Sequence, residues 1–256
     1  MKLVLDKYAH LSSPIHRWES RSKLVALLAL IFAFALVQKL VLLPAMLLVT
    51  TTLYILSRLP FSFLLSRLRY PGFFIAAVVF FLPLVSGDTV LFSWGFLQVR
   101  QEGCLLVLLI LTRFLCIMTV SIVLFGTAPF LTSIKSMRSL GLPSIIVDMM
   151  LLAYRYLEEF GATLTTMQRA MILRGFQPHI FSRRNLQVLA SLTGSLLVRS
   201  YDQSKRVYQA MILRGYGQKT NSNYHNSLGE INKFSLVASG VTLMVAFGFV
   251  VAEIGF

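Results

Sequence analysis

The chain has 256 residues, of which 56% are hydrophobic and only 13% are charged, and one soluble core does not usually bury so much apolar surface. The net charge of +14 would suit nucleic acid, but Lys and Arg stand in blocks between apolar runs, without an RNA-binding or zinc-finger motif. This composition predicts an all-α polytopic membrane protein that does not bind nucleic acid and whose basic segments face the cytoplasm.

The first half of the chain contains four predicted membrane spans. Apolar runs cover residues 24–37, 40–56, 70–85 and 103–125. The first run would rise only about 21 Å as a helix, whereas the hydrocarbon core is about 30 Å thick. Its helix is therefore expected to include flanking residues or to lie in thinned lipid. The arginine-flanked segment 60–68 predicts a short amphipathic helix at the membrane interface.

The remaining segments set the predicted topology. Residues 86–99 have almost no basic side chain and predict an external loop. Residues 126–233 contain more than half of the 24 Lys and Arg and predict long amphipathic helices in the cytoplasm, and a fifth span follows at 234–251. The expected organisation, with the N-terminus inside the cell, is a four-span membrane domain (1–125), a cytoplasmic domain (126–233) and a C-terminal transmembrane helix (234–256).

Few residues outside the basic segments suggest chemistry. Arg113 lies inside the fourth apolar run, where a charge is costly, and a structural ion pair or a snorkelling side chain is expected there. The same structural role is expected for Asp148 and Arg155, which share one helical face. No ATP-binding loop and no nucleophile beside a base are present. No metal site is expected from the scattered histidines, which are His10, His16, His179 and His225.

The sequence Ala-Met-Ile-Leu-Arg-Gly occurs twice, at 170–175 and 210–215, and an aromatic residue follows each copy. On a helix the Ala, Met and Arg of each copy share one face, and Gly directly after Arg predicts a left-handed C-cap. Alanine allows close approach, methionine fills an adaptable groove, and arginine binds a carboxylate through two parallel hydrogen bonds. Capping alone explains Arg and Gly, but it requires no particular residue four positions before Arg. The duplication predicts two equivalent partner-docking contacts, formed by Ala170, Met171, Arg174, Gly175, Ala210, Met211, Arg214 and Gly215.

These two copies resemble the Ala-x-x-x-Arg-Gly motifs at the ends of the coupling helices in transmembrane T components of energy-coupling factor (ECF) transporters. The resemblance covers nearly the whole chain. Near the N-terminus it extends to the Leu-His-Arg-x-x-x-Arg-x-Lys-Leu motif of CbiQ-type members, which serve cobalt uptake. The matching residues there are Ser13, Ile15, His16, Arg17 and Arg21 to Leu24, with Ile15 and Trp18 at positions where Leu is more usual.

The resemblance implies a non-catalytic coupling subunit of an ATP-driven importer in the bacterial inner membrane. Such a subunit links two cytoplasmic ATPase subunits, which hydrolyse ATP, to a separate membrane S component that captures the substrate. Cobalt is the implied cargo, with nickel or a vitamin as alternatives, and no cofactor is implied for this chain.

Two other classes of protein remain open. A stand-alone secondary transporter would need its own site at mid-membrane, and Arg113 is the only residue that favours one. A membrane-embedded lipid-modifying enzyme would need clustered acids or histidines at a membrane face. The chain has only 10 acids, and most of them are isolated.

Overall fold

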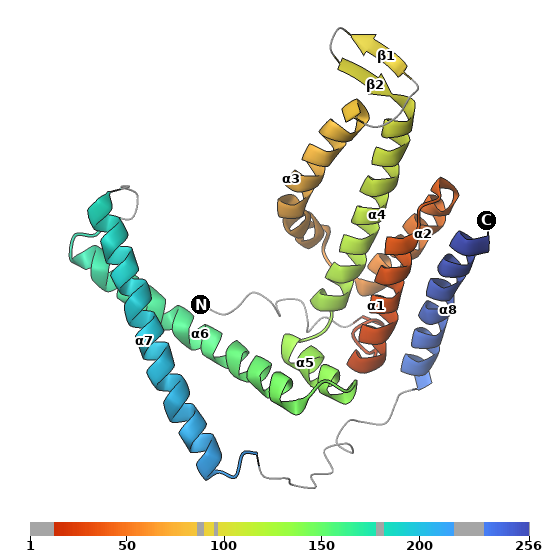
Figure 1. Ribbon diagram of the computed structural model, residues 1–256. Helices are drawn as coiled ribbons and strands as arrows, with labels where there is room; N and C mark the ends of the chain where they lie inside the picture. Colours follow the sequence, from red (N-terminus) through yellow and green to blue (C-terminus); the bar gives the residue numbers. More distant parts are fainter. Residues whose placement is uncertain (1–12, 86–89, 95–96, 178–181, 218–232, 256) are drawn as a thin grey trace. The chain divides into compact units, whose positions relative to one another are not determined.

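A computed structural model describes residues 13–85, 90–94, 97–177, 182–217 and 233–255 (Figure 1). The chain divides into two compact units, one of residues 4–142 with 230–256, which we call the membrane unit, and one of residues 143–229, which we call the α6–α7 unit. The elements are α1 (Ser20–Leu36), the 3-10 turn η2 (Leu40–Leu42), α2 (Leu43–Ser57), α3 (Phe61–Val85), β1 (Val90–Trp94), β2 (Leu97–Arg100), α4 (Gln101–Gly126), α5 (Phe130–Ser139), α6 (Ser144–Leu173), α7 (Arg183–Leu213) and α8 (Lys233–Gly255).

Each predicted apolar run forms a helix, and three helices of the described residues are long and apolar enough to cross a membrane. These three cover Leu40–Ser57, Leu105–Gly126 and Lys233–Gly255. The first predicted span is α1, which begins at Ser20 and so includes residues before the apolar run, as expected. The helical class of the fold is confirmed, while the count of five spans stays a prediction.

Two local expectations were wrong. The segment 60–68 is not a separate interfacial helix, because α3 continues from Phe61 to Val85. Pro71 lies inside α3, where a proline removes one backbone hydrogen bond without ending the helix. The second error is the loop at 86–99, where β1 and β2 pair as an antiparallel hairpin, with Trp94 opposite Leu97. Residues 86–89 and 95–96 lie outside the described residues.

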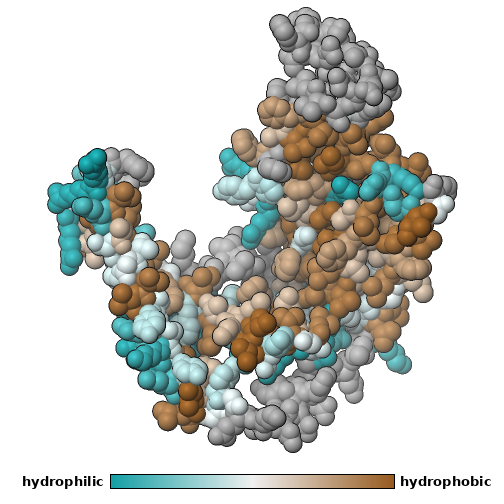
Figure 2. Space-filling view, viewed as in Figure 1, coloured by the Kyte–Doolittle hydropathy of each residue, from teal (hydrophilic) through white to brown (hydrophobic). Residues whose placement is uncertain are grey.

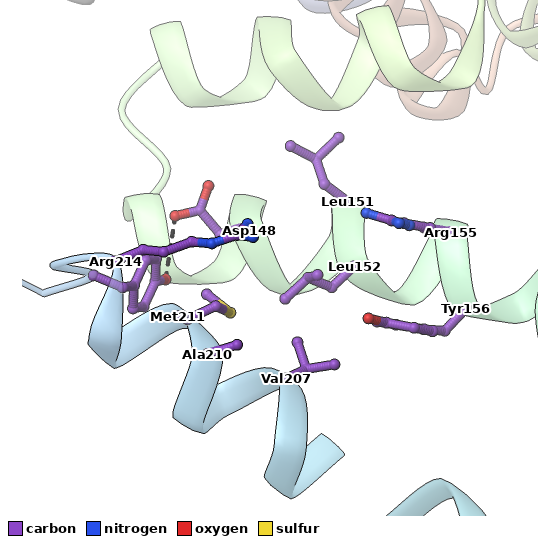
Figure 3. A pocket seen from close by; sticks show the side chains of 10 residues that line it. Asp148, Leu151, Leu152, Arg155, Tyr156, Val207, Ala210, Met211 and Arg214 are labelled. Carbon is purple, nitrogen blue, oxygen red and sulfur yellow. Dashed lines mark hydrogen bonds between the residues drawn. The ribbon is translucent and has the colours of Figure 1, made fainter. Parts of the chain in front are cut away.

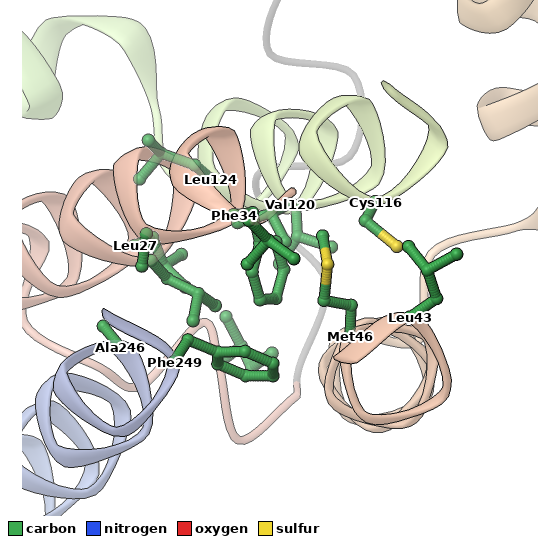
Figure 4. Close-up of a cluster of buried hydrophobic side chains, with 14 of the residues drawn as sticks. Leu27, Phe34, Leu43, Met46, Cys116, Val120, Leu124, Ala246 and Phe249 are labelled. Atoms are coloured by element: carbon green, nitrogen blue, oxygen red, sulfur yellow. The ribbon is translucent and has the colours of Figure 1, made fainter. Parts of the chain in front are cut away.

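The core of the membrane unit forms where α1 packs against α4 and α8 and where α2 packs against α4 (Figure 4). Leu27 and Phe34 of α1 are fully buried there, together with Val120 of α4. The ring of Phe34 meets the ring of Phe249 of α8 edge to face, with 5.2 Å between the ring centroids. The last helix of the chain therefore packs against the first and closes the unit.

The outward side chains of the same helices are also apolar. Phe32, Val41, Phe73 and Phe247 are all at least two-thirds exposed, and Figure 2 shows this surface as largely hydrophobic. Such a continuous apolar surface is rare on soluble proteins and indicates contact with lipid. The core and the exterior together identify a membrane protein, as the composition predicts.

Two cations cap helix ends inside the membrane unit. Arg113 Nη1 donates hydrogen bonds to the carbonyls of Ala35 (3.0 Å) and Val37 (3.1 Å), at the end of α1. Lys39 Nζ donates to the carbonyl of Glu253 (2.7 Å), near the end of α8. The last carbonyls of a helix lack partners in their own helix, and these cations supply them. Arg113 therefore has a structural contact, as expected, with backbone carbonyls in the place of an acidic partner, and the snorkelling alternative stays a prediction.

Lys23 joins the start of α1 to the end of α4. Its side chain is almost fully buried, and Nζ donates to the carbonyls of Ile15 (3.2 Å) and Thr127 (3.3 Å) and to Thr127 Oγ1 (2.8 Å). Beside it, the hydroxyls of Ser22 and Ser235 share a hydrogen bond of 2.7 Å. The starts of α1 and α8 and the end of α4 thus meet at one end of the membrane unit.

The α6–α7 unit consists of two long helices of 30 and 31 residues, which confirms the long helices expected in the basic region. The helices run antiparallel, because side-chain hydrogen bonds pair the end of each with the start of the other. Among the described residues of this unit, Val147 and Leu192 are the only buried hydrophobic side chains. The hydrogen bonds join Asn185 Nδ2 to the carbonyl of Gln177 (2.8 Å), Gln203 Nε2 to Glu159 Oε1 (2.9 Å), and Tyr216 OH to Asp148 Oδ2 (3.2 Å).

Candidate functional site

The two copies of the repeated sequence end α6 and α7 with the same backbone geometry. Gly175 and Gly215 have φ angles of 87° and 81°, in the left-handed region that glycine adopts without a Cβ clash. The amide of the following aromatic residue returns to the carbonyl of the Met in each copy, at 3.1 Å for Phe176 and 3.0 Å for Tyr216. This is the Schellman motif, and the predicted glycine caps are present at both helix ends.

At both helix ends the last apolar side chains before the cap are exposed to solvent. Leu173 is 89% exposed and Leu213 is 88% exposed, and Ile172 and Ile212 are also exposed at 53% and 50%. The exposure of the Ile and Leu side chains is therefore nearly the same in the two copies. Each end therefore offers an apolar patch that its own unit does not cover.

The predicted site residues divide into two groups. Arg174 and Arg214 are exposed, as a docking role requires, whereas Met171 and Met211 are half-buried against their own chain. The prediction selected Ala, Met and Arg because they share one helical face, and it passed over Ile and Leu. The repeat itself contained that signal, since Ile and Leu are identical in both copies and come directly before Arg.

The second copy lies at a groove of about 590 Å³ between α6 and α7 (Figure 3). On the α7 side, Ala210, Met211 and Arg214 line it. On the α6 side, Asp148 and Arg155 line it, which places these two on one face as expected. The groove is largely apolar otherwise, and its remaining lining residues are Leu151, Leu152, Tyr156, Val207 and Tyr216.

The chemistry of these helix ends suits binding. An exposed guanidinium can hold a carboxylate through two parallel hydrogen bonds, and an exposed Leu beside it can fill an apolar pocket of a partner. Among the described residues, no three His, Cys, Asp or Glu side chains come together as a metal site would require. His16 shares a 2.6 Å hydrogen bond with Ser13, and the other three histidines lie outside the described residues. The absence of a metal site in this chain stays a prediction.

The chain is similar to known transport proteins over most of its length. The family model CbiQ, described as cobalt transport protein, matches residues 11–225. Three relatives carry the name energy-coupling factor transporter transmembrane protein EcfT. The protein of Lactococcus lactis subsp. cremoris is 24% identical over 94% of this chain and 95% of its own length. The proteins of Streptococcus equi subsp. equi (27% identical, 84% of each chain) and Bacillus subtilis (23% identical, 94% of this chain and 95% of its own) are similar in the same way.

Proposed function

This chain belongs to the CbiQ family of cobalt transport proteins, and from this premise we propose that it is the transmembrane coupling subunit of an ATP-driven importer of the energy-coupling factor type. The observation that carries the proposal is the pair of matching helix ends, each with an exposed Leu, an exposed Arg and a glycine cap. A partner that binds both helix ends must itself have two similar binding sites. A pair of ATPase subunits provides two such sites, and the names of the relatives support a transporter that contains a transmembrane subunit of this type.

The antiparallel arrangement suits a partner whose two halves move. The two caps lie at opposite ends of the α6–α7 unit, because each helix runs past the other (Figure 1). A helix of 30 residues rises about 45 Å, so the contacts are far enough apart for two separate subunits. When ATP brings these subunits together, the caps are displaced relative to each other. The stiff helices carry this displacement to the membrane, where a separate S component that holds the substrate is tilted.

The side of the membrane follows from the distribution of charge. The segment 126–233 holds more than half of the Lys and Arg of the chain, which is typical of cytoplasmic segments. The proposal therefore places the N-terminus, α6 and α7 in the cytoplasm of a bacterial cell, where ATP is available. ATP hydrolysis belongs to the partner subunits, and this chain has no catalytic role.

Cobalt is the proposed cargo, and the description of the family supports it. The names of the relatives specify no substrate, so nickel and a vitamin are the alternatives. Vesicles that contain the complete assembly should take up cobalt when ATP is present on the ATPase side. Uptake of a vitamin in place of cobalt would overturn the choice of cargo but not the coupling role.

The docking role is tested by reversing the charge at both caps. Arg174→Glu with Arg214→Glu should abolish co-purification with the ATPase subunits, because each glutamate would face the carboxylate that the arginine binds. Loss of one charge partner at an interface costs about 2–5 kcal/mol, which is roughly a 30-fold to several-thousand-fold loss of affinity. Arg169→Glu with Arg206→Glu is the matched control, since both are exposed on the same helices and change the net charge equally. An assembly that survives the double reversal at the caps would show that the arginines do not dock.

The structure weakens the alternative of a stand-alone transporter. Arg113 was the residue that favoured it, and its Nη1 is occupied by the carbonyls of Ala35 and Val37. Uptake by this chain alone, in vesicles without ATP, would restore that alternative.

A further inference from the structure

The two helix ends share their cap but differ in the residue that follows it. The first copy continues with Phe176 and the second with Tyr216. The hydroxyl of Tyr216 donates a 3.2 Å hydrogen bond to Oδ2 of Asp148, near the start of α6, and Figure 3 shows this bond as a dashed line. Phenylalanine has no hydroxyl, so the first end cannot form the equivalent bond.

The charge near each end is also different. The first end lies beside the start of α7, where the carbonyl of Gln177 accepts a hydrogen bond from Asn185, and the neighbouring residues are Arg183 and Arg184. The second end lies beside the half-buried carboxylate of Asp148. One end therefore has two cations beside it, while the other has an anion together with the cation of Arg155.

The surroundings of the second end extend beyond this single bond. Arg214 and Tyr216 line one wall of the 590 Å³ groove, and Asp148 and Arg155 line the other wall. The Tyr216 bond spans these two walls. It therefore joins the residue just after the cap of Arg214 to the opposite wall of the groove.

We propose that Tyr216 and Asp148 form a tether that positions the second helix end for docking, and that the two docking contacts of this protein are inequivalent. This inference rests on the proposed function. The second end and the first turns of α6 meet their ATPase subunit as one surface, which includes Arg155. The first end meets its ATPase subunit beside Arg183 and Arg184, and there the Asn185 to Gln177 bond joins the two helices in place of a tyrosine hydroxyl.

The tether is measured first in the intact chain, in lipid nanodiscs, without the partner subunits. Tyr216→Phe gives the second end the aromatic residue of the first. Hydrogen exchange of the amides of Gly215 and Tyr216, which the cap protects, should then rise by roughly two- to tenfold, since a surface hydrogen bond contributes little more. Tyr208→Phe is the control, because Tyr208 is exposed on the same helix and should leave exchange unchanged. Equal exchange rates of the Gly215 and Tyr216 amides in Tyr216→Phe and Tyr208→Phe would show that the Tyr216 hydroxyl does not act as a tether.

The acceptor provides a second check that does not depend on the aromatic ring. Asp148→Asn keeps an oxygen that accepts from Tyr216 and should retain most of the protection. Asp148→Ala removes the acceptor and should match Tyr216→Phe. Protection that persists in Asp148→Ala would contradict the assignment of this pair.

Docking is measured separately, as the affinity of the purified ATPase subunits for each variant. Tyr216→Phe should weaken binding by roughly two- to tenfold, whereas Phe176→Tyr and Tyr208→Phe should not. If exchange rises in Tyr216→Phe but affinity does not change, the bond is structural only and the positioning role is overturned. The proposed function is decided independently, by the double reversal of Arg174 and Arg214.

Discussion

The membrane unit and the α6–α7 unit are both helical, but they are held together by different means. The membrane unit buries a continuous apolar cluster and fixes its helix ends with Lys23 and Arg113. The α6–α7 unit buries only Val147 and Leu192 among its described hydrophobic side chains. The first unit therefore packs its helices around a shared apolar core, whereas the second leaves most of its apolar side chains exposed, as the proposed docking to a partner requires.

The largest expected effect concerns the core of the membrane unit. Phe34→Ala removes a fully buried ring that packs on Phe249 and should lower the free energy of unfolding by about 3–5 kcal/mol. Phe32→Ala, on the same helix but 68% exposed, should cost less than about 1 kcal/mol. Thermal and denaturant unfolding in detergent micelles compares the two variants. Equal losses of unfolding free energy in the two variants would show that the buried apolar cluster does not stabilise the membrane unit.

The next effect concerns the buried cation. Lys23→Met leaves the carbonyls of Ile15 and Thr127 without their donor, at a cost of about 1–3 kcal/mol in unfolding free energy. Lys135→Met, on the exposed face of α5, is the control and should change stability little. The ATPase subunits should still co-purify with Lys23→Met under conditions where it is folded. If they were lost while the fold was intact, the separation of stability from docking would be wrong.

At the helix ends we expect the opposite result, in which ATPase binding is weakened while the stability of the fold is unchanged. Leu173→Ala with Leu213→Ala should leave the unfolding free energy within about 0.5 kcal/mol of the unchanged protein, because both side chains are almost fully exposed. The same pair should weaken ATPase binding by at least about tenfold, because burial of a leucine side chain at an interface contributes about 1.5–3 kcal/mol. Leu197→Ala, which is 70% exposed within α7, controls for the loss of any exposed leucine. Calorimetric or surface-based binding measurements distinguish these outcomes.

The most local expected effect concerns the caps. Gly175→Ala with Gly215→Ala places a Cβ at positive φ and should destabilise each helix end by about 1–2 kcal/mol, seen as faster hydrogen exchange there. Gly161→Ala with Gly194→Ala should have the opposite sign, with a gain of about 0.5–1 kcal/mol, because these glycines lie within the helices and have open space around them. If both pairs of substitutions changed stability in the same direction, the positive φ angle of Gly175 and Gly215 would not be the reason that glycine is needed at the caps.

Much of the fold was predictable because the forces concerned are local. Apolar runs of sufficient length specify membrane helices, and each run lies in a helix, although α3 begins nine residues before its predicted span. The caps at Gly175 and Gly215 were predictable for the same reason, since an arginine followed by glycine determines the backbone within one turn. The β1–β2 hairpin and the continuity of α3 were missed, because the distribution of charged residues is a weak indicator of chain conformation.

The sequence by itself determined that the protein resides in a membrane, where its helices run and that two of them end alike. Only the tertiary structure decided which groups meet: Arg113 with the end of α1, Lys23 with Thr127, and Tyr216 with Asp148. These contacts join residues 68 to 104 positions apart. Helical periodicity specifies which side chains share a face, but only the packing of distant helices determines which neighbour covers that face and which side chains it leaves exposed.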